Sequence, residues 1–300
     1  MLINSENLRT LGVAFNASFQ GGLGMAPQDH MRVASQVPST TGQNEYGWLG
    51  QIPGVREWVG DRVVQNLNAH SYAIKNKDFE LTIGVRRNDI QDDNVGIYGP
   101  MFTEMGRSTG ALPCQLVYQL LKAGWTTACY DNQNFFDTVH PVISKDGSTV
   151  NQVANTDGGA GEPWFLIDDS RAIKPLLLQM RKEFEFVAKD RPTDDNVFNK
   201  KEFLYGADAR MNVGFGFWQF AWGSKQVLDD AHYKLARASI AQFTGDYGKP
   251  IGASGKLLIV GPNNEEAART LLKADRNAAG ATNVWMGSAE LLVSDWLAVA

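Results

Sequence analysis

Residues 212–223, NVGFGFWQFAWG, decide how this 300-residue chain folds. Glycines and aromatic residues alternate there, and successive side chains of a strand point to opposite faces. Phe215 and Phe217 therefore share one face and Trp218 and Trp222 the other, and both faces are mostly apolar. Such a strand is either sealed inside its own domain or presents one face to another molecule. The sequence thus leaves a choice between core and contact surface.

Composition excludes several classes of protein. Hydrophobic residues make up 43% of the chain, which is long enough for a sizeable core and two domains. A formal net charge of -5 argues against a protein that works mainly by gripping nucleic-acid phosphates. The two cysteines, Cys114 and Cys129, rule out a disulfide scaffold. The sequence shows no signal peptide and no apolar run long enough to span a membrane, so we expect a protein made inside a cell.

The first third of the chain predicts a helix, an arm and a hairpin. Apolar residues recur every three or four positions over residues 4–20, which predicts an amphipathic helix ended by the glycines at 21–24. Residues 26–43 show no periodicity and are expected to be extended. The Gly/Pro-rich stretch that follows carries Trp48 and Trp58 without an obvious local core. We expect these tryptophans to find cover elsewhere, for example on a neighbouring chain.

The rest of the chain mixes helices and strands, which predicts an α+β fold. The longest helix is expected over about 101–123, with a bend or new start at Pro113. Shorter elements are predicted as a strand at 79–85, a helix at 229–243, a buried strand at 256–262, a helix at 263–275 and a strand at 290–299.

The search for chemistry finds one weak catalytic pattern. Asp137 and His140 lie near Cys129 and Asp131, and a carboxylate that orients an imidazole beside a thiol is typical of nucleophilic catalysis. A histidine before a proline in a turn is more often a hydrogen-bonded structural residue, and we favour that interpretation. Eight tryptophans also raise a sugar-binding hypothesis, but most lie in apolar runs where packing is the default. The sequence predicts no metal site and no cofactor.

The ordered blocks of the sequence carry a family resemblance from about residue 5 to 297. The chain resembles the major head subunit of Mu-like phages and prophages in the segments NLRTLGVAFNASFQGGL, QVPSTTGQNEYGWLGQIPGVREWVGDR, FELTIGVRRNDIQDDNVGIYGP, NFFDTVHP, DARMNVGFGFWQFAWGS and GKPIGASGKLLIVGP. Each block alone is weakly specific, whereas their ordered combination is strongly so.

The resemblance implies a major capsid protein with the HK97-like fold. It further implies hexamers and pentamers that build an icosahedral head around double-stranded DNA. On this basis the chain divides into an N-terminal arm (1–45), an E-loop hairpin (46–78), a mainly peripheral domain (79–224) that contains a long spine helix, and a mainly axial domain (225–300). The last two blocks stand in the reverse of their order in related capsid families, and a permuted connection between the two domains would explain this.

The resemblance also implies partners and contact residues. We expect contacts between subunits at Phe15, Phe19, Trp48, Arg56, Trp58 and Arg62. No long charged segment precedes the arm, so a separate scaffold protein is expected, together with a portal protein. The packaged DNA would be contacted non-specifically, and a decoration protein is left open. Assembly is expected in the host cytoplasm and the final location is the virion. The first alternative to a phage capsid protein is the shell protein of an encapsulin-like compartment. The second is a hydrolase that uses Cys129, Asp137 and His140.

Overall fold

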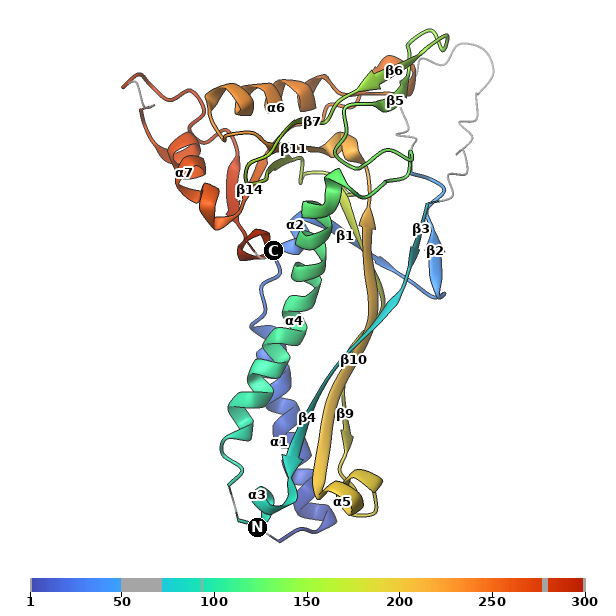
Figure 1. Ribbon diagram of the computed structural model, residues 1–300, viewed down its shortest axis with the longest axis vertical. Helices are drawn as coiled ribbons and strands as arrows, with labels where there is room; N and C mark the ends of the chain where they lie inside the picture. The colour runs from blue at the N-terminus through green and yellow to red at the C-terminus, as the bar shows by residue number, and fades with distance from the viewer. Residues whose placement is uncertain (1, 50–71, 93, 277–279, 299–300) are drawn as a thin grey trace.

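The computed structural model describes residues 2–49, 72–92, 94–276 and 280–298 of the chain. Figure 1 shows an elongated molecule with two parts. We call the part with the long helices and strands, which ends at the N-terminus, the lower body; it contains α1, α3, α4, α5, β1, β4, β9 and β10. The compact part at the other end is the upper body, which contains β5–β8, β11, β14, β15, α6 and α7.

The bounds of the elements are as follows. The helices are α1 (Ser5–Gly24), α2 (His30–Val33), α3 (Arg87–Gln91), α4 (Tyr98–Lys122), α5 (Asp195–Lys200), α6 (Asp230–Gln242) and α7 (Glu265–Lys273). The strands are β1 (Ala34–Pro38), β2 (Gln43–Glu45), β3 (Ala73–Lys75), β4 (Lys77–Arg86), β5 (His140–Ile143), β6 (Val150–Val153), β7 (Thr156–Gly159), β8 (Trp164–Ile167), β9 (Leu176–Lys189), β10 (Glu202–Phe215), β11 (Ala221–Lys225), β12 (Thr244–Gly245), β13 (Lys249–Pro250), β14 (Leu257–Val260) and β15 (Glu290–Val293).

A four-stranded sheet and two helices form the lower body. The strand order is β1-β9-β10-β4, in which β10 runs antiparallel to both β9 and β4, and β1 runs parallel to β9. The helices α1 and α4 pack on each other and on this sheet (Figure 1). Phe15, Phe19, Phe102 and Tyr205 fill the space between them, and this apolar burial drives the packing.

Two glycines set how closely α1 and α4 approach. A Cβ on Gly22 would lie 1.9 Å from the carbonyl oxygen of Thr103, and a Cβ on Gly106 would lie 2.0 Å from that of Phe19. The helices therefore touch backbone to backbone, which side chains would prevent. This explains why α1 continues through the glycines at 21–24, where the sequence predicted that it would end. These glycines belong to a helix contact and not to a turn.

The spine helix expected at about 101–123 is confirmed as α4. It runs as one element through Pro113, where the sequence predicted a bend or a new start. A proline inside a helix removes a hydrogen bond and crowds the preceding turn. Here α4 is held along its length by α1 and by the strands β9 and β10, and this packing offsets the loss.

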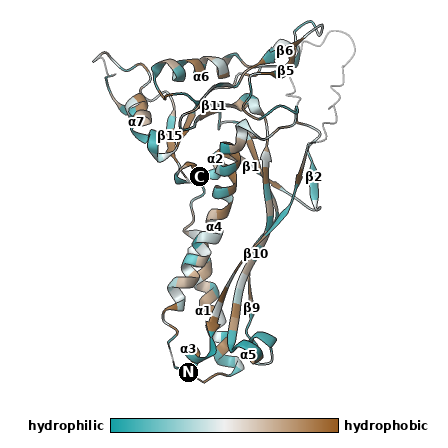
Figure 2. Ribbon diagram, viewed as in Figure 1, coloured by the Kyte–Doolittle hydropathy of each residue, from teal (hydrophilic) through white to brown (hydrophobic). Residues whose placement is uncertain are grey.

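The upper body is built on a five-stranded sheet of order β15-β14-β8-β11-β7. Its strands β8 and β14 run antiparallel to each other, and every residue of both is buried. Burial of consecutive residues means that both faces of the sheet are covered. The predicted helices at 229–243 and 263–275 are confirmed as α6 and α7, and the predicted strand at 256–262 as β14. Figure 2 shows hydrophobic residues concentrated in these strands and along β10.

The chain passes between the two bodies three times. It enters the upper body after α4, returns between β8 and β9, and enters again between β10 and β11. Residues 156–167, which the sequence analysis grouped with the peripheral domain, pair as β7 and β8 in the upper sheet beside β11. The expected boundary at residue 224 falls inside β11, so a single boundary there does not describe the path of the chain between the two bodies.

The aromatic stretch at 212–223 is one of the three crossings. The strand β10 ends at Phe215, a short 3-10 turn spans Trp218–Phe220, and β11 begins in the other sheet. The expectation of one strand was therefore wrong, and of the two alternatives that the sequence left open, the structure shows burial in the core. A Cβ on Gly216 would lie 2.7 Å from the carbonyl oxygen of Lys174, so only glycine lets the chain turn so close to the other crossing.

The N-terminal arm is mostly part of the folded body. The helix expected over residues 4–20 is confirmed as α1, which packs against α4. Residues 26–43, expected to be extended, instead include the helix α2 and add β1 to the lower sheet. Their apolar side chains find cover within the chain. Among the described residues, no helix is long and apolar enough to cross a membrane.

Candidate functional site

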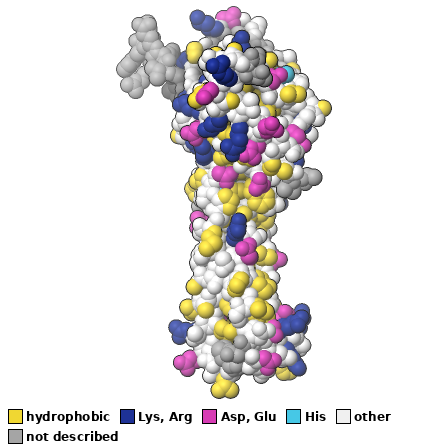
Figure 3. All heavy atoms as spheres, turned by 90° about the vertical axis from the view of Figure 1, so that its left-hand side faces the viewer, with side chains coloured by type: hydrophobic (Ala, Val, Ile, Leu, Met, Phe, Trp, Pro, Cys, Tyr) yellow, Lys and Arg dark blue, Asp and Glu magenta, His cyan; other side chains and the backbone are white. Residues whose placement is uncertain are grey.

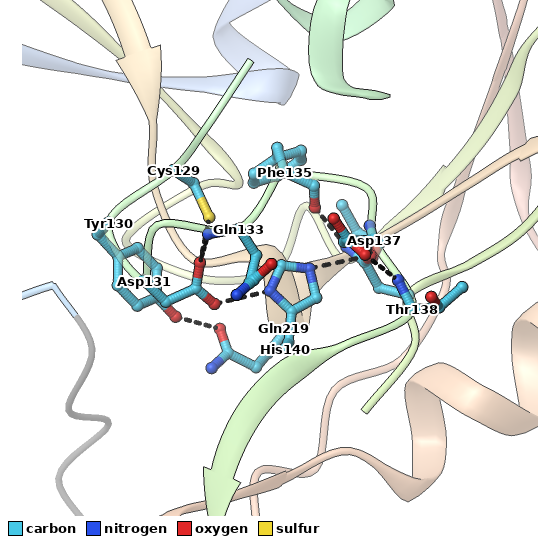
Figure 4. A network of polar contacts seen from close by, with 11 residues as sticks. Cys129, Tyr130, Asp131, Gln133, Phe135, Asp137, Thr138, His140 and Gln219 are labelled. Atoms are coloured by element: carbon cyan, nitrogen blue, oxygen red, sulfur yellow. Dashed lines mark hydrogen bonds and ion pairs between the residues drawn. The ribbon is translucent and has the colours of Figure 1, made fainter. Parts of the chain in front are cut away.

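His140, the first residue of β5, lies at the centre of a buried polar cluster where the crossings meet (Figure 4). Its side chain is fully buried, and its ring stacks on that of Trp218 with centroids 4.2 Å apart. The ring atom Nδ1 lies 2.7 Å from Oδ2 of Asp131. The histidine is thus held by a carboxylate on one side and by an aromatic ring on its face.

Asn155 fixes the other side of the imidazole. Its Oδ1 accepts a hydrogen bond from the backbone N–H of Asp137 at 3.0 Å, and its Nδ2 donates to the carbonyl of Phe135 at 2.8 Å. These backbone partners set the orientation of the amide, so Oδ1 is the atom that faces Nε2 of His140 at 3.2 Å. Both ring nitrogens therefore face an oxygen atom, so the imidazole is held from both sides.

Cys129 and Asp131 belong to one buried hydrogen-bond network. The Cys129 thiol donates to Oδ1 of Asp131 at 3.0 Å, and the Gln133 N–H donates to the same oxygen. Burial raises the pKa of Cys129 far above its usual range, and the adjacent carboxylate raises it further, so the sulfur stays protonated. Burial alone would also raise the pKa of Asp131, but the hydrogen bond and charge of His140 outweigh this and hold it below its usual value.

The predicted catalytic arrangement of Cys129, Asp137 and His140 is wrong. Asp131, and not Asp137, holds the imidazole, while Oδ1 of Asp137 accepts from the backbone N–H of Thr138 at 2.7 Å. Cys129 is a buried thiol and not a nucleophilic thiolate. Donor atoms of Cys129, Asp131 and His140 lie within 4.8 Å of one another, as metal ligands would, but hydrogen bonds among them already occupy these atoms. The cluster ties the loop after α4 to β5, to Asn155 and to the 3-10 turn at Trp218.

Two of the expected contact residues are buried inside the chain. Phe15 and Phe19 are 3% and 0% exposed, and the Phe15 ring stacks on Phe102 with centroids 4.4 Å apart. Because α1 folds onto α4, these side chains form the core of the lower body. They are not surface contacts in this structure.

The remaining expected contact residues divide into one described residue and three others. Trp48 is half-buried against Phe217 and Tyr46, with ring centroids at 5.9 and 6.1 Å, so it packs mainly within the chain. Arg56, Trp58 and Arg62 lie outside the described residues.

Several exposed apolar side chains were missed by the sequence analysis. The most exposed are Phe198 at 84%, Leu2 at 80%, Val284 at 76%, Val227 at 74%, Met25 at 66% and Val13 at 65%. They share no common spacing in the sequence, so no periodicity marks them. Figure 3 shows hydrophobic side chains along the lower body, on a face whose middle carries few charges, while charged side chains gather on the upper body. Surfaces of this kind are typical of contact regions.

Comparison with known proteins gives consistent results. The family model of the Mu-like prophage major head subunit gpT matches residues 8–297. The chain is 42% identical to the major capsid protein of Escherichia phage Mu over 99% of this chain and 100% of that protein.

Solved structures give the same picture. A chain of the procapsid of bacteriophage JBD30 superimposes with a TM-score of 0.87 at 41% identity, covering 98% of this chain and 100% of that one. A chain of the JBD30 capsid decorated with minor capsid protein trimers gives a TM-score of 0.76 at 33% identity, covering 93% of this chain and 94% of that one.

Proposed function

This chain belongs to the Mu-like prophage major head subunit gpT family and is a major capsid protein of a phage head, and from this premise we propose how its copies assemble. They form hexamers and pentamers that close into an icosahedral shell around double-stranded DNA. The observation that carries the proposal is the match of the whole chain, in sequence and in fold, to subunits of phage heads. The lower body then corresponds to the peripheral domain and the upper body to the axial domain.

The contacts between subunits are proposed to combine the E-loop with the exposed surface of the lower body. Residues 46–78 form the E-loop in this proposal, and Arg56, Trp58 and Arg62 are its contact residues. Weakly charged apolar surface on the neighbouring lower body would cover them (Figure 3). Many such modest interfaces add up to a stable shell, because each subunit is held by several neighbours at once.

Other partners follow from the same proposal. A separate scaffold protein directs assembly, and a portal protein occupies one vertex. Because minor capsid protein trimers decorate the similar JBD30 capsid, we propose a decoration protein here as well. The net charge of -5 favours loose, non-specific contact with the packaged DNA over a tight clamp. Assembly would take place in the host cytoplasm, before the protein becomes part of the virion.

Electron microscopy of the purified chain tests the proposal. The chain, alone or co-produced with the scaffold protein encoded beside it, should form rings or hollow icosahedral particles with pentameric vertices. A chain that stays strictly monomeric at high concentration in both preparations would overturn it. Protection of double-stranded DNA from nuclease inside particles that also contain a portal separates a phage head from a cargo compartment.

A further inference from the structure

Phe198 projects from the free end of the lower body. It lies on α5, a short helix between β9 and β10, and 84% of its side chain is exposed. Asp194 and Asp195 precede it by four and three residues, so both acids lie on the same side of the helix as the phenyl ring. Lys200 and Lys201 follow the ring, so the end of the molecule carries one large apolar knob with acidic residues on one side and basic residues on the other.

A hollow of about 330 Å³ lies at the same end of the molecule, between α1 and the end of β9. Its apolar lining is formed by Leu8, Gly12, Val13, Phe186 and Ala188. Gly12 and Ala188 leave the space open, since a Cβ on Gly12 would meet its nearest atom only at 3.5 Å. Val13, at its rim, is 65% exposed.

The charges around the knob and around the hollow are complementary. Arg9 and Arg191 border the hollow, and both are exposed. Asp190 also borders it, but its carboxylate accepts a hydrogen bond from Tyr205 at 3.4 Å. An aromatic ring with carboxylates on one side and ammonium groups on the other therefore matches an apolar hollow that is bordered by two guanidinium groups and one carboxylate.

We propose that Phe198 of one copy of the chain inserts into the α1–β9 hollow of a neighbouring copy. The chain does not fill the hollow with its own Phe198, because that ring is almost entirely exposed. The elements that carry them, α5 for the knob and α1 with the end of β9 for the hollow, lie at one end of the molecule (Figure 1). Because knob and hollow are different surfaces, the contact is heterologous and can close into a small ring of lower bodies. The inference rests on the proposed assembly of identical subunits and names one of its interfaces.

Engineered cysteines give a direct test, because the two native cysteines, Cys114 and Cys129, are buried. Val13→Cys and Phe198→Cys place thiols at the hollow and on the knob. Particles of the double variant should form covalent multimers under mild oxidation, and particles mixed from the two single variants should form dimers. Each single variant alone should stay monomeric on a denaturing gel. Double-variant particles that give no cross-link would overturn the proposal, as would Phe198→Cys particles that cross-link equally well alone.

Assembly itself gives a second test with a matched control. Phe198→Ser should raise the protein concentration needed for particle formation roughly tenfold, the effect of losing about 1.4 kcal/mol at an interface. Gly12→Leu, which fills the hollow, should do the same with an unchanged circular dichroism spectrum. Val284→Ser, at an equally exposed apolar site on the upper body, should have no effect.

The outcomes separate the two proposals. A wild-type chain that forms no particles refutes the proposed assembly. Particles that tolerate Phe198→Ser and Gly12→Leu as well as they tolerate Val284→Ser refute only the knob-and-hollow contact.

Discussion

His140→Ala should destabilise the upper body severely. The change removes the 2.7 Å contact with Asp131, the 3.2 Å contact with Asn155 and the stack on Trp218. Removing one member of a buried ion pair costs about 3–5 kcal/mol, because the partner charge stays buried without compensation. The lost ring stack adds about 0.5–1.5 kcal/mol. Since a domain is stable by only about 5–15 kcal/mol, the variant should lose a large part of its stability.

Urea unfolding of the unassembled chain, followed by tryptophan fluorescence, measures this loss. With a slope of about 2–3 kcal/mol per M, the expected loss lowers the midpoint by about 2 M. The matched control is His232→Ala on α6, where the same pair of groups, His232 Nδ1 and Asp229 Oδ1, meets at 3.0 Å on the surface. An exposed pair contributes at most about 1 kcal/mol, so this midpoint should hardly move.

A double-mutant cycle with Asp131→Ala tests the cause. If the ion pair dominates, the double variant should lose less unfolding free energy than the two single variants lose together, by about 2 kcal/mol or more. The reasoning is refuted if His140→Ala and His232→Ala shift the midpoint equally. It is also refuted if His140→Ala keeps its full stability while removing a hydrolytic activity, since that result would revive the catalytic interpretation.

Three further changes test other parts of the structure. Gly106→Val should force α1 away from α4 and lower the free energy of urea unfolding by about 1–3 kcal/mol. The control Gly21→Ala has no atom within 4 Å of the new Cβ and should be neutral or stabilising. Equal effects of the two changes would contradict the backbone contact. Phe15→Ala should cost about 3–5 kcal/mol by the same measurement and leave unassembled chain that aggregates, and a soluble, fully stable variant would show that Phe15 is not core. Bonds from Ser170, Ser254 and Arg171 hold the pKa of Asp168 below its usual value despite burial, so Asp168 contributes stability above roughly pH 4 that is lost as the pH falls through its folded pKa. Asp168→Asn should therefore lower the melting temperature at pH 7, and this deficit should shrink as the pH is lowered below about 4. A deficit that persists unchanged in acid would contradict this assignment.

The elements that the sequence predicted well are those set by local patterns. The helix α6 and the strand β14 follow from spacing within their own residues, and the structure adds that the Asp229 side chain caps α6 by accepting from the His232 N–H. Burial of the aromatic stretch was one of two alternatives, because two apolar faces suit a core as well as a contact surface. Its division between two sheets could not be predicted, since alternation continues through Gly216 and only the distant Lys174 carbonyl turns the chain there.

The polar cluster shows the same limit at the level of single residues. Asp131 and Asp137 are both close to His140 in sequence, and nothing in their spacing tells which one the fold directs at the ring. Whether an apolar residue is buried or free for contact depends on residues that lie still farther away in the sequence. Phe15 looked available because its cover, Phe102 and Tyr205, lies far along the chain, whereas Phe198 drew no attention because exposure leaves no pattern.

The interleaved path of the chain determines the order in which a ribosome can complete the fold. The core of the lower body pairs Phe15 with Tyr205, which is synthesised roughly 190 residues later, and at about 5–20 residues per second this takes roughly 10–40 s. During that time the nascent helices α1 and α4 expose an apolar face without the strands that cover it. The upper sheet forms later still. Its strand β8 pairs with β11 and β14, which are both synthesised after it, and β14 is made only near the end of the chain. Newly made chains of this subunit therefore keep apolar surface uncovered until most of the sequence has been synthesised, and the two bodies can be completed only after that point.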